Sequence, residues 1–117
     1  MSTLKLLSAI SRPRNNLPTL TTRVVGRAEV IEQLHRELRQ SRVVSIVGAG
    51  GIGKTTVALV VAERAVDQFA DGVWLVDFAR LRDPSLVPHA IASATGLVVH
   101  SGDVIAALCR FARDREL

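Results

Sequence analysis

The sequence predicts an α/β fold in which helices cover both faces of a parallel sheet. Two short runs, Arg42–Val47 and Val73–Phe78, indicate buried strands, because their β-branched and apolar residues are nearly continuous. Helical periodicity fills the chain around them, in the order helix, strand, helix, strand, helix, helix. That alternation is typical of α/β proteins.

The expected helices have apolar residues at helical spacing, and one of them also has signals at both of its ends. Asp83 and Pro84 suit the cap and first position of one helix, which Gly96 closes. The long helix after the first strand has little polar surface, as expected where neighbours cover it. The helices are expected over Glu29–Gln40, Lys54–Phe69, Asp83–Gly96 and Asp103–Arg113.

Composition and charge restrict the classes of protein to consider. The chain has 117 residues, of which 48% are hydrophobic, enough for one small domain with a core. The basic residues outnumber the acidic ones by 15 to 11, and residues 1–28 carry no acid. This arm could touch nucleic acid or serve as a solvated linker. The expected division is a linker or basic arm over residues 1–22, followed by one domain over 23–117.

Several classes are excluded by what the sequence lacks. A single cysteine, Cys109, excludes an intrachain disulfide and a cysteine-based zinc site. No apolar run is long enough to cross a membrane, so neither a membrane partner nor a membrane location is expected. The expected location is the cytoplasm.

The strongest functional signal lies between the first strand and the following helix. Gly48–Thr55 matches the phosphate-binding pattern GxxxxGK[ST] at every fixed position. Glycines let the loop curl so that its amide groups point at phosphate oxygens, and the helix start adds further free amides. The residues expected to bind nucleotide here are Gly48, Ala49, Gly50, Gly51, Ile52, Gly53, Lys54, Thr55 and Thr56.

Three side chains of this loop have separate expected roles. Lys54 should reach the β- and γ-phosphates and stabilise charge there, which is its expected catalytic role. The Thr55 hydroxyl should ligate Mg²⁺, and Thr56 should lie near the α-phosphate. The expected cofactors are therefore ATP or ADP with Mg²⁺.

Two other interpretations of the glycines stay open at this point. Gly48–Gly53 also fits GxGxxG, the dinucleotide-binding pattern, with Asp77 as the acidic residue that follows a second strand. Lys54 and Thr55 have no purpose in that interpretation, which favours the phosphate loop. The third possibility is an ordinary glycine-rich turn beside a chance lysine.

The flanking residues resemble one class of phosphate-loop proteins more than others. Asn16–Pro18, then Val25-Gly26-Arg27, then VVSIVGAGGIGKTTVAL resemble the opening of the STAND class of signal-transduction ATPases, which includes NB-ARC-like ATPases. The resemblance is to ATPases joined to winged-helix or LuxR-type transcriptional regulators, and it covers about Asn15 to Leu97. It implies a three-layer α/β/α fold. It also implies that Val25 and Gly26 line the base and that Arg27 contacts the nucleotide, although Arg27 could instead only start a helix.

The resemblance also implies partners and a missing part. DNA would be contacted only through a linked domain, and the partner would be the rest of the ATPase domain or a full-length regulator. In this class the acidic strand that holds Mg²⁺ comes later than Val73–Phe78, so the chain is expected to be the first part of the domain, ending before that strand. A small self-sufficient ATPase or kinase that uses Asp77 is one alternative. A non-functional fragment that serves only in interactions is another.

Overall fold

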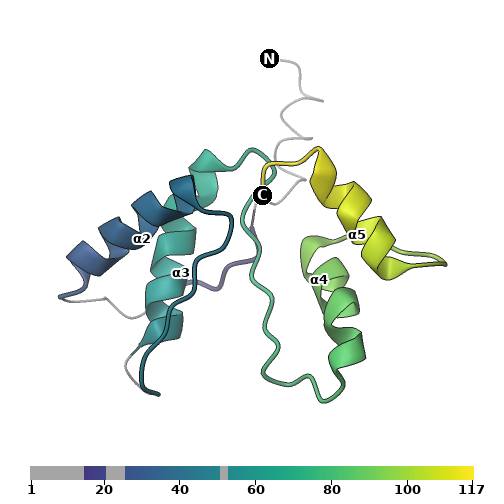
Figure 1. The fold of residues 1–117 in the computed structure, drawn as a ribbon, viewed down its shortest axis with the longest axis horizontal. Coiled ribbons are helices and arrows are strands. Elements are labelled where there is room, and N and C mark those ends of the chain that lie inside the picture. The colour runs from purple at the N-terminus through teal and green to yellow at the C-terminus, as the bar shows by residue number, and fades with distance from the viewer. Residues whose placement is uncertain (1–14, 21–25, 51–52) are drawn as a thin grey trace. The chain divides into compact units, whose positions relative to one another are not determined.

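The computed structural model describes residues 15–20, 26–50 and 53–117, which fall into two compact units (Figure 1). The amino-terminal unit is Leu17–Gln68. The carboxy-terminal unit combines residues 15–16 with Phe69–Leu117. The boundary expected at residue 22 lies outside the described residues.

The amino-terminal unit is a pair of packed helices. Helix α2 covers Ala28–Gln40, and α3 covers Lys54–Ala65 and continues into the 3₁₀ turn η1, Val66–Gln68 (Figure 1). Their shared core holds Ile31, Val57 and Val61, each nearly inaccessible to solvent, with half-buried Leu34, Ile46 and Val60 packed around them. Apolar residues spaced at helical intervals therefore meet face to face, and α3 begins directly after the glycine loop.

An extended segment connects the two helices, and it packs on them through alternate residues. Val44 and Ile46 are half-buried, and Ile46 lies against the helical core. Val43 and Val47 are 81% and 88% exposed. The period of two is that of an extended backbone with one face on the protein.

The carboxy-terminal unit contains a second helical pair. The 3₁₀ turn η2, Pro84–Leu86, leads into α4, Val87–Thr95, which packs against α5, Val104–Arg113 (Figure 1). Gly96 ends α4 in the left-handed conformation at φ 75°. None of the helices in the described ranges is long and apolar enough to span a lipid bilayer.

The segment after Asp71 is extended, and it contacts Asn15 and Asn16 through one backbone bridge and two side-chain hydrogen bonds. Val73 forms an isolated parallel bridge with Asn15. The side-chain amide of Asn16 accepts from the Leu75 amide at 2.6 Å and donates to the Leu75 carbonyl at 2.9 Å. Asn16 thus supplies one donor and one acceptor to Leu75, as a neighbouring strand would.

The predicted parallel sheet, and with it the three-layer α/β/α phosphate-loop fold, is wrong for this structure. The described residues contain helices, turns and one isolated bridge, without a strand ladder. Arg42–Val47 and Val73–Phe78 are extended, but neither forms a backbone ladder with another described segment. Apolar, β-branched sequence favours an extended chain, whereas a strand also needs a neighbour for its amides and carbonyls.

The predicted helices, in contrast, are confirmed with small shifts at their ends. The second is shorter as an α-helix than expected and finishes as 3₁₀, and the third begins with a 3₁₀ turn at Pro84. Caps and periodicity act within a few residues of the helix, so they need no distant partner.

Candidate phosphate-binding site

The start of α3 has a backbone conformation that depends on glycine. Gly53 precedes the helix at φ 81°, ψ 26°, in the left-handed region. A Cβ added there would meet no atom within 4 Å, so glycine is favoured here by the backbone conformation and not by lack of space. The loop approaches the helix in a conformation that other residues adopt only at a cost in energy.

This helix start is open, because no side chain caps it. The first intrahelical bond runs from the Val57 amide to the Gly53 carbonyl, at 3.0 Å. The amides of Lys54, Thr55 and Thr56 therefore precede the helical ladder. The first turn also contains no acidic residue. Free amides and the positive end of the helix dipole together favour a bound anion.

Lys54 brings a positive charge across the loop. Its Nζ donates a hydrogen bond to the Gly48 carbonyl, six residues earlier. That bond joins the two ends of the glycine segment. Ala49 and Gly50 are exposed, and space is open beside Gly50. Gly51 and Ile52, which the sequence also assigns to the site, lie outside the described residues.

The two threonines after Lys54 differ in exposure. Thr55, the expected Mg²⁺ ligand, is exposed, and Thr56 is half-buried. Since both follow Lys54 directly in the first turn of α3, the structure brings them together with the ammonium group at one helix end. In the part of the chain that the structure describes, no three His, Cys, Asp or Glu side chains form a metal-binding group. A cation here would therefore need ligands from bound phosphate or water as well as Thr55.

The Val25-Gly26-Arg27 element is described only in part. Val25 lies outside the described residues, and Gly26 has a φ of 77°. Arg27 occupies the position before α2, where its carbonyl accepts from the Ile31 amide at 3.0 Å. The backbone of Arg27 therefore starts α2, and its expected contact with nucleotide stays a prediction.

Asp77 belongs to the carboxy-terminal unit and serves a local turn there. Its Oδ1 accepts from the Ala79 amide at 2.9 Å, and the residue is exposed. A side chain that bonds to the backbone two residues on is typical of aspartate in turns. The role in holding Mg²⁺ that the alternative ATPase or kinase would give to Asp77 stays a prediction.

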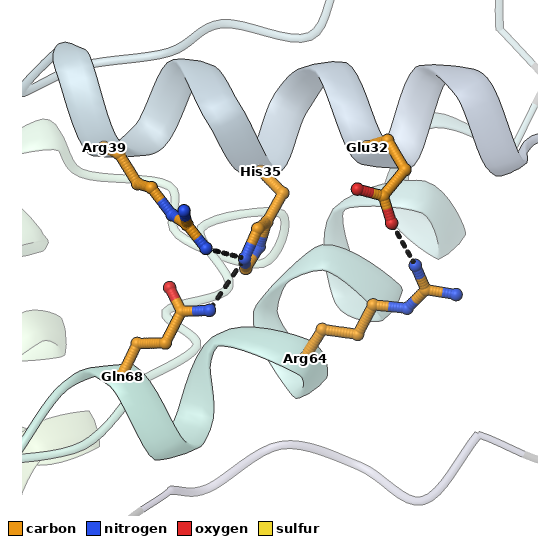
Figure 2. Close-up of polar contacts among 5 residues, drawn as sticks. All are labelled: Glu32, His35, Arg39, Arg64 and Gln68. Carbon is orange, nitrogen blue, oxygen red and sulfur yellow. Dashed lines mark hydrogen bonds and ion pairs between the residues drawn. The ribbon is translucent and has the colours of Figure 1, made fainter.

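The sequence does not predict the polar contacts between residues that are far apart in the chain. Asn16 pairs with Leu75, which is 59 residues away, and His35 contacts Gln68, 33 residues away (Figure 2). Neither pair leaves a pattern in the sequence, because each partner lies outside any window in which spacing is informative. The sequence indicates Asn16 only through the resemblance at Asn16–Pro18.

The chain is similar to segments of several larger bacterial proteins, some of which are named as regulators. No family model matches the chain, and no solved structure does. An uncharacterized protein of Mycobacterium tuberculosis is 31% identical over 98 residues, which are 84% of this chain and 24% of that protein. A protein of the same organism named an HTH-type transcriptional regulator is 33% identical over 81 residues, 68% of this chain and 9% of the relative.

A third relative comes from another genus. The regulatory protein AfsR of Streptomyces coelicolor is 33% identical over 109 residues, 81% of this chain and 11% of its own length. The chain thus spans about a quarter of the first relative and about a tenth of the other two. It is similar to segments of larger proteins, two of which are named as regulators.

Proposed function

We propose that this chain is a nucleotide-binding module of a regulator of the signal-transduction ATPase type, with ATP or ADP and Mg²⁺ bound at Gly48–Thr56. The observation that carries the proposal is the Lys54 ammonium group, bonded to the Gly48 carbonyl across the glycine loop at an uncapped helix start. Fixed positive charge beside free backbone amides is the arrangement that polyphosphates need.

We expect the amides of α3, Lys54 and Thr55 to bind different parts of the nucleotide. A phosphate chain would lie against the amides of the first turn of α3, where charge-assisted hydrogen bonds are stronger than neutral ones. The Lys54 amine would exchange the Gly48 carbonyl for phosphate oxygens. Thr55 would hold Mg²⁺ together with those oxygens. Each step uses a group that the loop already presents.

The regulator class is supported by the relatives and by the residues quoted from the sequence. Two relatives are named as regulators, one of them as HTH-type. We infer that nucleotide occupancy biases a longer protein between two states, through different affinities for the nucleotide in each state. DNA would be contacted by another part of such a protein and not by this module.

Calorimetric titration of the chain with ATP·Mg²⁺ and ADP·Mg²⁺ tests the proposal. The Lys54→Ala variant loses a charge-assisted contact, so we expect affinity to fall roughly 10- to 100-fold. Arg36→Ala is the matched control, because it removes one positive charge from an exposed position on α2. That variant should bind within about twofold of the wild type.

Two results would overturn the proposal. One is a flat titration of the wild-type chain with both nucleotides at millimolar concentration. The other is an equal loss of affinity in Lys54→Ala and Arg36→Ala, which would reduce the binding to unspecific attraction by net charge.

A further inference from the structure

The Asn16 side chain occupies the backbone groups of Leu75, in the extended segment Val73–Phe78. The Asn16 Oδ1 accepts from the Leu75 amide at 2.6 Å, and the Asn16 Nδ2 donates to the Leu75 carbonyl at 2.9 Å. Leu75 presents one donor and one acceptor, so only this orientation of the side-chain amide satisfies both. The backbone bridge between Asn15 and Val73 holds the preceding residue beside the same segment.

The backbone of an extended segment has two edges, and Asn16 covers one of them at Leu75. The amide and carbonyl of one extended residue point to the same side, and those of the next residue point to the opposite side. Val76 therefore belongs to the other edge. Its amide and carbonyl make no hydrogen bond with any residue that the structure describes. The segment thus has a covered edge at Leu75 and an open edge at Val76.

The sequence of Val73–Phe78 is of a kind that pairs readily between chains. The run VWLVDF is rich in β-branched and aromatic residues, carries one charge, and contains neither proline nor glycine. The Leu75 and Phe78 side chains are 37% and 43% exposed, so apolar surface accompanies the extended backbone. An exposed strand edge of this composition is a template for association unless something covers it.

We propose that the Asn16 side chain blocks strand pairing between copies of this chain at Val73–Phe78. A second copy fits the site because it carries the complementary edge. The Leu75 edge of one copy would pair with the Val76 edge of the next. Such a head-to-tail contact does not close on itself, so it leads to growing assemblies and not to a dimer.

The two hydrogen bonds of Asn16 set the energetic barrier to this pairing. An incoming strand has to displace the Asn16 side chain before it can bond to Leu75, and it loses both bonds in doing so. In Asn16→Ala only water has to be displaced. We therefore expect this variant to self-associate at a concentration roughly 10- to 100-fold lower than the wild type. The inference does not depend on the proposed nucleotide, because Asn16 lies outside Gly48–Thr56.

The other extended segment, Arg42–Val47, offers a competing route to association. Its Val43 and Val47 side chains are 81% and 88% exposed. The test therefore needs a variant that closes only the route through Val73–Phe78. Val76→Pro removes the amide of the open edge, and the residue before it is already extended, as proline requires.

Sedimentation velocity over a range of concentrations tests the proposal on the full chain. Asn16→Ala should form larger assemblies than the wild type, and Asn16→Ala/Val76→Pro should return to the behaviour of the wild type. Gln33→Ala is the matched control, because it removes an exposed side-chain amide whose bond is to Glu37 of the same helix. This variant should sediment like the wild type. Circular dichroism at low concentration checks that each variant keeps its helices.

Three results would overturn the proposal. One is equal self-association of Asn16→Ala and Gln33→Ala. Another is undiminished association of Asn16→Ala/Val76→Pro, which would place the contact elsewhere. The third comes from hydrogen exchange of the wild type and decides the matter even if Asn16→Ala does not fold. The Leu75 amide, which is bonded, should be protected about fivefold more than the Val76 amide, and equal protection would contradict the covered edge.

Discussion

Helices in the two units begin in opposite ways. Helix α5 is capped by Asp103, whose carboxylate accepts from the amides of Ile105 at 2.9 Å and Ala106 at 3.3 Å. Helix α3 follows Gly53, and no side chain caps it. Both starts expose amides and the positive end of a dipole. At the start of α5 the chain itself supplies an anion, the Asp103 carboxylate. At the start of α3 no side chain occupies the corresponding position.

The difference teaches where a ligand could bind and where it could not. At α5 an external phosphate would have to displace the carboxylate of Asp103, which is the residue directly before the helix. At α3 it would meet free amides and the amine of Lys54. The two helix starts can therefore be compared directly, because both present free backbone amides but only α5 has a carboxylate bound to them.

Converting the α3 start into one like the α5 start should produce the largest effect. Gly53→Asp places a carboxylate at the cap position, where it competes with phosphate for the same amides and repels it. We expect ATP affinity to fall more than about 100-fold, the combined loss of a charged contact and added repulsion. Calorimetric titration measures the change.

Gly53→Asn is the matched control for that substitution. Asparagine has nearly the same shape, also tolerates the left-handed backbone, and carries no charge. It should retain clearly more affinity than Gly53→Asp. Equal affinity in the two variants would mean that the backbone of Gly53, and not an open anion site, governs binding.

Removing the cap of α5 should lower the stability of the protein without changing nucleotide affinity, and this effect should be smaller than that of Gly53→Asp. Asp103→Ala leaves the amides of Ile105 and Ala106 without their acceptor and should lower the free energy of unfolding by about 1 kcal/mol. Urea denaturation measures it, with Asp103→Asn as a control that still caps. Nucleotide affinity should not change. A loss of affinity in Asp103→Ala would show that the two helix starts are not independent.

The contrast also explains how far the sequence could predict the fold. The helical start at Asp83 and Pro84 and the stop of α4 at Gly96 were predictable, because these residues act on the residues next to them. The sheet was not, because strand pairing depends on a neighbour that no local pattern identifies. The sequence of Arg42–Val47 predicts an extended backbone, but it does not predict that this segment lacks a strand partner.

The candidate site divides in the same way. Gly53 and Lys54 form part of a motif with fixed spacing, so the sequence identified them together. His35 gave no signal, since its partner Gln68 is 33 residues away and the buried ring nitrogen depends on how α2 packs on α3. Local backbone chemistry was thus predictable, and contacts between elements were not.

The smallest effect is expected at the other helix start that a side chain caps in the described residues, that of η2. The Ser85 backbone amide donates to Asp83 at 2.9 Å, and this bond, helped by the Ser85 side chain, lowers the pKa of the Asp83 carboxyl below its ordinary value of 3.8. The pKa is lower in the folded than in the unfolded chain. The cap therefore stabilises the fold above pH 3.8, and this contribution is lost as the pH falls through the lowered pKa.

An NMR titration of the side-chain carboxyl carbons can detect this effect. The Asp83 signal, assigned by its absence in Asp83→Asn, should titrate below the range of an ordinary aspartate. In the same variant the acid-induced loss of stability should be slightly smaller than in the wild type. Because Asp83 is fully exposed, water and salt weaken the effect, so it should shrink further at high ionic strength. A carboxyl that titrates at its ordinary pKa would show that the η2 start is held by Pro84 and the backbone, with no charged cap.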